Sequence, residues 1–272
     1  MKKILTTKKI RKNKVSEGST PLQMLTCYDY QNACLLDNTE LDLILVGDSL
    51  GNVVLGYDTT VEVSIEEMAV FTSAVKRGAK NTFVVGDLPF GTYSTLESAL
   101  KNAIYLFQKS KVEALKLEGA FPHQLDIIKR LTQTGIPIMG HIGLTPQSVH
   151  QLGGYYVHGK KSKTAEALKK QAYDLEEAGC FAIVLECVEA NLSEEITKSL
   201  SIPTIGIGSG TATDGQVLVL NDLLHMGPLP PPSFCDPVTN LYQVKKSYID
   251  QYLSEQKSLT SSLNDEAEIT LH

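Results

Sequence analysis

The sequence lacks long apolar runs and an excess of basic charge. None of its apolar segments approaches the ~18 consecutive residues that a membrane-spanning helix needs. Its 25 Lys and Arg are outnumbered by 31 Asp and Glu, giving a net charge of −6, which argues against nucleic acid as the main partner. With 272 residues and a hydrophobic content of 42%, the chain is typical of a globular protein, and we expect no membrane or nucleic-acid partner.

Paired-cysteine motifs are also missing. The number of cysteines is odd and none of them has the CxxC spacing: Cys27, Cys34, Cys180, Cys187 and Cys235. Three of them lie in or beside apolar runs, as buried thiols do. We therefore expect reduced thiols in a cytoplasmic protein, without a disulfide framework or a zinc site.

The N-terminal segment is basic like the start of a signal peptide but lacks its apolar core. It reads MKKILTTKKIRKNK, and its apolar part is only Ile4–Leu5, short of the ~7 residues that such a core requires. The same Lys and Arg lack the interleaved aromatic residues of a nucleic-acid-binding arm. We expect a solvated helix over about residues 6–15 and, at the other end, a polar tail over 254–272 that is frayed or disordered.

Eight short apolar segments recur along the chain, most of them ending on a charged residue or a glycine. They are LQMLTCYDY, LDLILVGDSLG, TFVVGDLPF, VEALKLEGA, IPIMGHIGL, FAIVLECV, SIPTIGIGSG and GQVLVLND. Amphipathic stretches of helix length lie between most of them, at 64–78, 95–110, 121–134, 164–178 and 191–200. This alternation predicts an α/β protein with parallel strands, and eight strands predict a single (β/α)8 TIM-barrel domain over 1–272. The alternative, a doubly wound sheet, would carry a GxGxxG turn after its first strand, and CYDYQNACLL has none.

Charged residues at the strand ends are the candidates for a functional site. In a barrel, the carboxyl ends of the strands meet at one rim, which would make neighbours of Asp48, Asp87, Glu118, His141 and Glu186. Several carboxylates in a partly desolvated site repel one another, and a bound cation resolves that repulsion. Oxygen ligands favour Mg²⁺ over Zn²⁺.

Each of these residues has a structural alternative. An aspartate at a strand end can simply cap the next helix. Lys116, two residues from Glu118 on one strand face, could neutralise that glutamate or bind substrate. His141 could be a metal ligand, a proton carrier or a structural histidine. The residues alone predict a Mg²⁺-dependent barrel enzyme acting on a small oxyanionic substrate.

A series of short motifs carries a resemblance to a known family. In order along the chain they are TCYDY, LVGDSLG, GYDTT, DLPFGTY, LKLEG, GHIGLTPQ, GGYYVHGK, VLECV, IPTIGIGSG and TDGQ. Together, over roughly residues 7–222, they resemble the 3-methyl-2-oxobutanoate hydroxymethyltransferase (ketopantoate hydroxymethyltransferase) family. The resemblance implies a barrel of the phosphoenolpyruvate/pyruvate superfamily type, a homodecamer, and the use of Mg²⁺ with 5,10-methylenetetrahydrofolate.

The resemblance also implies a role for each residue that matches a family motif. The implied metal ligands are Asp48, Asp87 and Glu118, the last through water or directly. The implied substrate contacts are Asp48, Ser49, Asp87 and Lys116. Glu186 matches the proton acceptor, and His141 is a supporting candidate.

The implied reaction moves a hydroxymethyl group from 5,10-methylenetetrahydrofolate to 3-methyl-2-oxobutanoate. It gives 2-dehydropantoate (ketopantoate) on the route to pantothenate and coenzyme A, through a Mg²⁺-stabilised enolate formed when C3 loses its proton. One rival is a carbon–carbon lyase of the same barrel superfamily that uses no folate, and the other is a ring-forming barrel without activity. The motifs KLEG and VLEC together favour the transferase.

Overall fold

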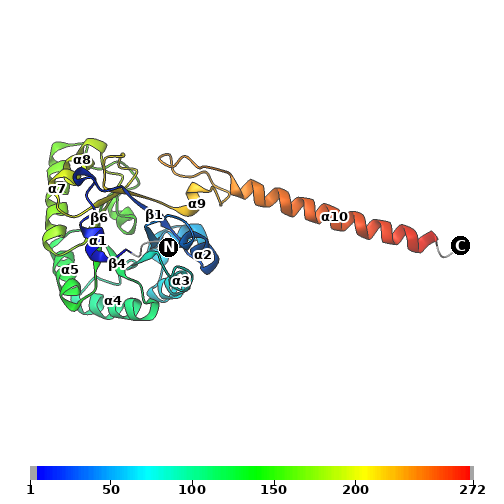
Figure 1. Ribbon diagram of the computed structural model, residues 1–272, viewed down its shortest axis with the longest axis horizontal. Helices are drawn as coiled ribbons and strands as arrows, with labels where there is room; N and C mark the ends of the chain where they lie inside the picture. Colours follow the sequence, from blue (N-terminus) through cyan, green and yellow to red (C-terminus); the bar gives the residue numbers. More distant parts are fainter. Residues whose placement is uncertain (1–4, 270–272) are drawn as a thin grey trace. The chain divides into compact units, whose positions relative to one another are not determined.

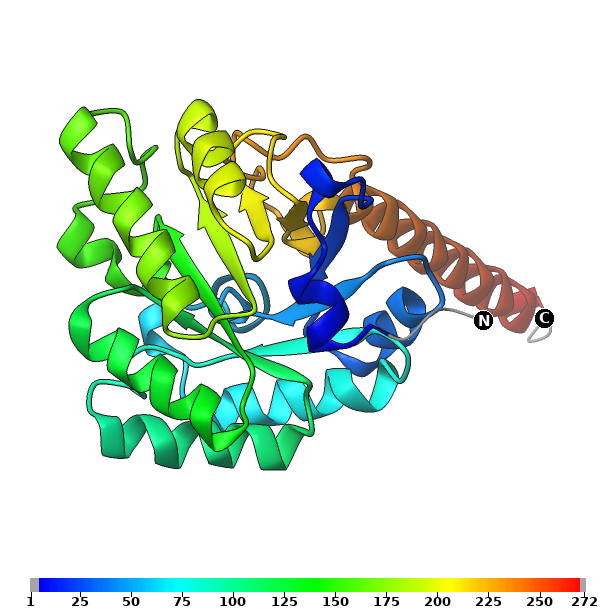
Figure 2. The same ribbon diagram turned by 60° about the vertical axis from the view of Figure 1, so that its left-hand side comes forward.

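A closed barrel of eight parallel strands is the centre of the protein. The computed structural model describes residues 5–269, with side chains to residue 257. The chain divides into two compact units, Met1–Val219 and Leu220–His272. In the first unit each strand pairs with the next along the chain and β8 closes on β1, while helices ring the strands on the outside (Figures 1 and 2). The predicted (β/α)8 barrel is confirmed.

Every predicted strand and every predicted helix between strands is present within a few residues. The strands are β1 (Leu22–Thr26), β2 (Leu43–Val46), β3 (Phe83–Asp87), β4 (Ala114–Glu118), β5 (Ile138–Gly143), β6 (Ala182–Glu186), β7 (Thr204–Ile207) and β8 (Gly215–Leu218). The helices are α1 (Thr7–Arg11), α2 (Tyr30–Asp37), α3 (Ile65–Gly78), α4 (Leu96–Ser110), α5 (Pro122–Thr134), α6 (Val149–Leu152), α7 (Ser162–Glu177), α8 (Ala190–Ser199), α9 (Leu220–Leu223) and α10 (Leu241–Ile269).

Capping residues explain why the predicted helix boundaries agree with the observed ones. Helix α3 begins with a capping box in which Ser64 and Glu67 each accept a backbone N–H of the other. Helix α5 starts on Pro122, whose missing N–H costs nothing at that position, and ends at Gly135 with φ of 96°. These signals are read directly from the sequence.

The two ends of the chain differ from expectation. Helix α1 covers only Thr7–Arg11, and Val15–Glu17 form a separate short turn of 3₁₀ helix. Helix α10 continues to Ile269, so the tail expected to fray from residue 254 is helical over its described part, while residues 270–272 lie outside the described residues. From Leu241 to Ile269 the sequence has no proline or glycine that would end the helix.

Apolar side chains fill the barrel interior up to its carboxyl end. Every second residue of a strand faces inward, as Phe83 and Val85 do on β3 and Ala182 and Val184 do on β6. Phe83 and Phe181 pack with ring centroids 5.9 Å apart, and the fully buried Ile10 of α1 joins the same cluster.

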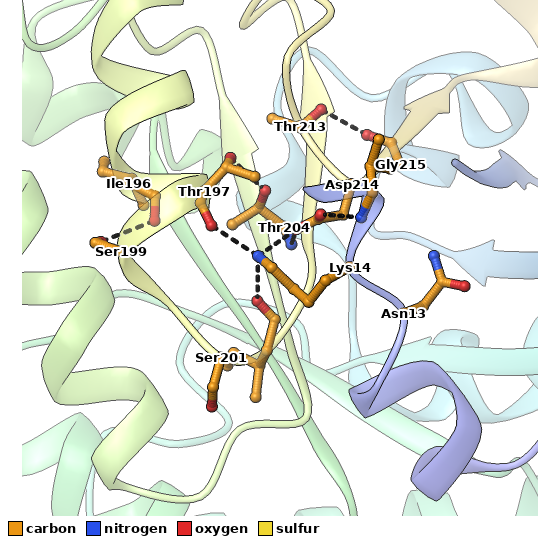
Figure 3. A network of polar contacts seen from close by, with 12 residues as sticks. Asn13, Lys14, Ile196, Thr197, Ser199, Ser201, Thr204, Thr213, Asp214 and Gly215 are labelled. Carbon is orange, nitrogen blue, oxygen red and sulfur yellow. Dashed lines mark hydrogen bonds and ion pairs between the residues drawn. The ribbon is translucent and has the colours of Figure 1, made fainter. Parts of the chain in front are cut away.

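A buried ion pair fixes the N-terminal segment to the barrel (Figure 3). Lys14 Nζ lies 2.6 Å from Oδ2 of Asp214 and donates to the carbonyl oxygens of Thr197 and Ile202. The other oxygen of Asp214 accepts the N–H of Val15 at 2.9 Å. Both charged side chains are at most 4% exposed, so removing one would leave the other unpaired, at a cost of about 3–5 kcal/mol.

The second unit contains the long helix α10. The helix leaves many apolar side chains exposed: Tyr242, Val244, Tyr248, Ile249, Tyr252 and Leu253. No helix among the described residues is both long enough and apolar enough to cross a membrane.

Candidate active site at the carboxyl end of the barrel

The strand ends bring most of the predicted site residues together. Asp87 ends β3, Glu118 ends β4 and Glu186 ends β6, while Asp48 lies two residues beyond β2. In the sheet register, Asp87 is opposite Lys116 and Glu118 is opposite His141. Residues at one level of neighbouring strands point into the barrel side by side, so the register itself builds the cluster.

Lys116 is the central cation of this cluster. Its Nζ lies 2.9 Å from Oδ2 of Asp87 and 3.4 Å from Oε1 of Glu118. The backbone N–H of Asp48 also donates to Oδ2 of Asp87, at 3.2 Å. All four side chains are at most 5% exposed. Lys116 therefore neutralises part of the acid cluster, and the structure shows that structural role directly.

Even with Lys116 present, the cluster has too much negative charge. Burial, followed by the charges of Asp87 and Glu118, raises the pKa of Asp48 well above its usual value. Burial likewise raises the pKa of Asp87, although Lys116 opposes the shift. Burial also acts to raise the pKa of Glu118, but Lys116 and His141 outweigh it and lower that pKa. Asp48 and Asp87 are thus the pair whose ionised forms need a further cation.

His141 connects Glu118 to Glu186. Its Nδ1 lies 3.2 Å from Oε1 of Glu118, and its Nε2 lies 3.3 Å from Oε2 of Glu186, at ion-pair distance but without good hydrogen-bond geometry. Burial and the charge of Lys116 lower the pKa of His141, but the two glutamates outweigh them and raise it to about 9. The two carboxylates thus favour the protonated imidazole, and Lys116, whose Nζ lies 3.3 Å from Nδ1, opposes it.

Glu186 is the most accessible carboxylate of the cluster. Its side chain is 18% exposed, against at most 5% for Asp48, Asp87 and Glu118. Gly143 lies opposite it in the register with φ of 97°, and a Cβ there would come within 2.3 Å of the Glu186 carbonyl oxygen. Only glycine fits this close approach. Glu186 thus keeps part of its side chain accessible to solvent, unlike the other three carboxylates.

Gln147 is a site residue that sequence reasoning missed. Its side-chain N–H₂ donates to Oδ2 of Asp48 at 2.9 Å, and its backbone N–H donates to Oε2 of Glu118 at 3.2 Å. The buried hydroxyl of Tyr93 donates to the Gln147 carbonyl oxygen and so fixes which way the amide points. GHIGLTPQ was noted only as a motif, and nothing in the spacing of Gln147 from the strand end indicated these contacts.

Ser49 is the remaining predicted substrate contact. Ser49 shares a 2.7 Å hydrogen bond with the hydroxyl of Tyr28, so its Oγ is held at the rim next to Asp48. In the GIGSG segment, the buried Ser209 accepts the N–H of Val188 and donates to the carbonyl oxygen of Leu185. That hydroxyl joins β7 to the end of β6. Cys187 is buried with a raised pKa of about 11, mainly because of burial, which suits a packing role.

The acid cluster fits a hard divalent cation, although it is not a ready-made cage. Among the described residues no three His, Cys, Asp or Glu side chains converge closely enough to enclose a metal ion. However, Oδ1 of Asp87 is buried without a hydrogen-bond partner, which is costly unless a ligand satisfies it. That orphaned oxygen and the repulsion between Asp48 and Asp87 are the features that a cation with oxygen ligands relieves.

Comparison with solved structures shows the fold. Phosphoenolpyruvate phosphomutase from Streptomyces platensis subsp. rosaceus is 11% identical with a TM-score of 0.64, over 93% of this chain and 88% of that chain. A 2,3-dimethylmalate lyase, described as a PEP mutase/isocitrate lyase superfamily member, is 13% identical with a TM-score of 0.57, over 79% and 81%. The chain therefore shares its barrel fold with those two structures.

Comparison at the sequence level identifies the family. A 3-methyl-2-oxobutanoate hydroxymethyltransferase of Bacillus cereus (strain G9842) is 49% identical over 246 residues, which cover 90% of this chain and 88% of the relative. The family model for ketopantoate hydroxymethyltransferase matches residues 4–260. With this match extending over the whole barrel and its acid cluster, the chain belongs to the ketopantoate hydroxymethyltransferase family.

Proposed function

We propose that this protein transfers a hydroxymethyl group to C3 of 3-methyl-2-oxobutanoate, giving 2-dehydropantoate on the route to pantothenate and coenzyme A. The donor in this proposal is 5,10-methylenetetrahydrofolate, and water supplies the hydroxyl oxygen. The observation that carries it is the arrangement at the barrel rim. A buried acid pair that needs a cation, Asp48 and Asp87, adjoins an accessible carboxylate, Glu186, in a chain 49% identical to a relative of that name.

Mg²⁺ is the cation that the proposal assigns to the site. Asp48 and Asp87 would hold it, with Glu118 as a third ligand directly or through water. When bound, Mg²⁺ supplies a Lewis acid that stabilises negative charge developing on the keto oxygen of the substrate. Lys116 and Ser49 are the proposed contacts of the oxyanionic end of the 2-oxo acid. Supporting this, Lys116 Nζ lies 2.9 Å from Oδ2 of Asp87, and Ser49 directly follows Asp48.

Glu186 is the proposed proton acceptor. The C3–H bond of the substrate breaks and its proton passes to the Glu186 carboxylate. C3 then bonds to the one-carbon unit, whose two bonds to folate nitrogens are replaced by one bond to C3 and one to a hydroxyl from water, and tetrahydrofolate leaves. His141, 3.3 Å from Oε2 of Glu186, orients that carboxylate, and the raised pKa of His141 favours its protonated form.

Two further features belong to the proposal. The exposed apolar side chains of α10, such as Tyr248 and Tyr252, support a homo-oligomer, for which we propose a decamer. The cytoplasm is the proposed compartment, because all five cysteines are free thiols.

The proposal is tested by proton NMR in D₂O. The purified protein with Mg²⁺ should remove the C3 proton of 3-methyl-2-oxobutanoate, and the addition of methylenetetrahydrofolate should then give 2-dehydropantoate. EDTA should stop both reactions. Exchange that never leads to product, even with the folate, would instead support a carbon–carbon lyase, and neither exchange nor product from folded protein would overturn the chemistry.

A further inference from the structure

A cavity opens beside the acid cluster. Its volume is about 690 Å³, within the ~300–1,000 Å³ of typical small-molecule sites. It lies between the β4–α5 turn, the end of β5, the segment leading into α7, and the first turns of α7 itself. Gly119, directly after Glu118, and Gly143, opposite Glu186, belong to its wall. One side of the cavity therefore adjoins the proposed reacting centre.

The charge of this cavity is opposite to that of the site beside it. Lys160 and Lys161 line it, and the described residues of its wall include no Asp or Glu. Both lysines are exposed, and neither forms an ion pair with any residue whose side chain the structure describes. In a chain of net charge −6, a cavity with only basic charge favours an anionic ligand.

The same cavity offers aromatic surface. Phe121 and Tyr156 line it with exposed fractions of 55% and 50%, and Tyr156 stacks on His158 with ring centroids 4.3 Å apart. Exposed rings held in place by neighbours are suited to stacking against a planar ligand. The ligand that fits is thus partly aromatic and partly anionic.

The backbone holds this wall in a fixed position relative to Glu186. His158 donates its N–H to the carbonyl oxygen of Cys187 at 2.7 Å and accepts the N–H of Glu189 at 2.9 Å. The next residue, Gly159, has φ of 83°, and a Cβ there would meet Leu192 at 2.3 Å. This constrained turn directly precedes Lys160, so the lysines begin from a point fixed to the end of β6.

We propose that this cavity binds the p-aminobenzoylglutamate part of the folate donor, with Phe121 and Tyr156 against the aromatic ring and Lys160 and Lys161 on the glutamate carboxylates. The inference rests on the proposed function, because the folate comes from there. The inference adds where the folate donor binds, and it predicts that folates with several glutamates bind more tightly than the monoglutamate. The one-carbon end then lies toward Glu186, where C3 of the 2-oxo acid reacts.

The test is calorimetric titration of the full-length protein with tetrahydrofolate carrying one or three glutamates. In the double variant K160E/K161E, affinity for the triglutamate should fall about tenfold or more, because repulsion replaces two charge-assisted contacts. Affinity for the monoglutamate should fall less. The Mg²⁺-dependent exchange of the C3 proton should stay at the wild-type rate, since neither lysine belongs to the acid cluster.

The matched control is K101E/K109E, which makes the same charge change on exposed positions of α4, away from this cavity. It should bind both folates as the wild type does. An equal loss of triglutamate affinity in both double variants would overturn the inference, as would unchanged triglutamate affinity in K160E/K161E. Proton exchange and product formation by the wild type would still support the proposed function in either case. If the wild type forms no product, the proposed function is wrong, but the folate titration still tests the cavity. Folate binding by the wild type that is lost in K160E/K161E would then support the cavity as the folate site, and no folate binding by the wild type would overturn it.

Discussion

At the scale of single residues, the site separates charge neutralisation from proton transfer. Lys116 and the proposed cation serve the deeply buried Asp48 and Asp87, whereas Glu186 keeps 18% of its side chain exposed and contacts His141. A base must reach the substrate, whereas a metal ligand needs only to reach the cation. The difference in burial between these carboxylates therefore matches the difference in their proposed roles.

Replacing Glu186 by Gln should strongly slow proton abstraction without disturbing the metal site. The amide has nearly the same size but cannot accept the C3 proton, so exchange in D₂O should slow by about 10²–10⁴-fold. Mn²⁺ affinity, followed by electron paramagnetic resonance as a stand-in for Mg²⁺, should match that of the wild type. Wild-type exchange in the variant would remove Glu186 from the mechanism.

Replacing Gln147 by Leu should weaken the metal site from outside it. Asp48 loses its amide donor and Tyr93 its acceptor, so the carboxylate is no longer oriented. Loss of such a supporting partner lowers metal affinity by about 10–100-fold, measurable by titration calorimetry with Mg²⁺. Gln133→Leu, on an exposed position of α5, is the control, and equal Mg²⁺ affinity in both variants would contradict the role of Gln147.

At the scale of elements, one carboxylate joins α2 to the start of β3. Asp37, the last residue of α2, accepts hydrogen bonds from the backbone and side chain of both Asn81 and Thr82, at 2.8–2.9 Å. Burial raises the pKa of Asp37, but these four bonds outweigh it and lower the pKa. The ionised carboxylate is thus part of the folded structure of this corner.

Asp37→Ala should reduce stability in a pH-dependent way. Because the folded-state pKa lies below the unfolded-state value of about 3.9, the stabilisation is complete well above that value and is lost as pH falls through the folded-state pKa. At pH 7 the variant should be less stable by about 1–3 kcal/mol, and the difference should shrink below pH ~4. Urea unfolding at several pH values measures this, and the exposed Asp58→Ala should show no such loss.

At the scale of the whole molecule, helix α10 is the feature that a single chain does not explain. A helix of 29 residues exposes the large apolar side chains of Tyr248, Ile249 and Tyr252, and such side chains grouped on one element commonly mark an interface between proteins. In the proposed decamer this surface would be covered by other copies of the chain.

The oligomer should depend on α10. Sedimentation of the full chain should give a mass of about ten times 29.7 kDa, as expected for a homo-oligomer held by extensive apolar contacts. Replacing Tyr248, Ile249 and Tyr252 by Ser should shift the mass toward smaller species, because less apolar surface is available for burial. A full-chain sample that sediments as a monomer would refute the proposal, as would variant particles of unchanged size.

The sequence by itself determined the barrel and the chemical type of its rim. Strands such as LILV and FVVGD are apolar on both faces, and the helices between them carry their own start and stop signals, as Ser64 and Gly135 do. Parallel strands joined in this way have few possible arrangements, and their charged ends must meet at one rim. The cluster of Asp87, Glu118 and Glu186 was therefore predictable.

Only the tertiary structure decided which charges contact one another and what surrounds them. The register placed Lys116 opposite Asp87 and His141 opposite Glu118, and a shift by one residue would have turned each side chain away. Gln147 reached Asp48 across 99 residues of chain, and the basic cavity arose where segments from β4, β5 and α7 meet. Such contacts depend on distances in space between residues remote in sequence, which no local pattern encodes.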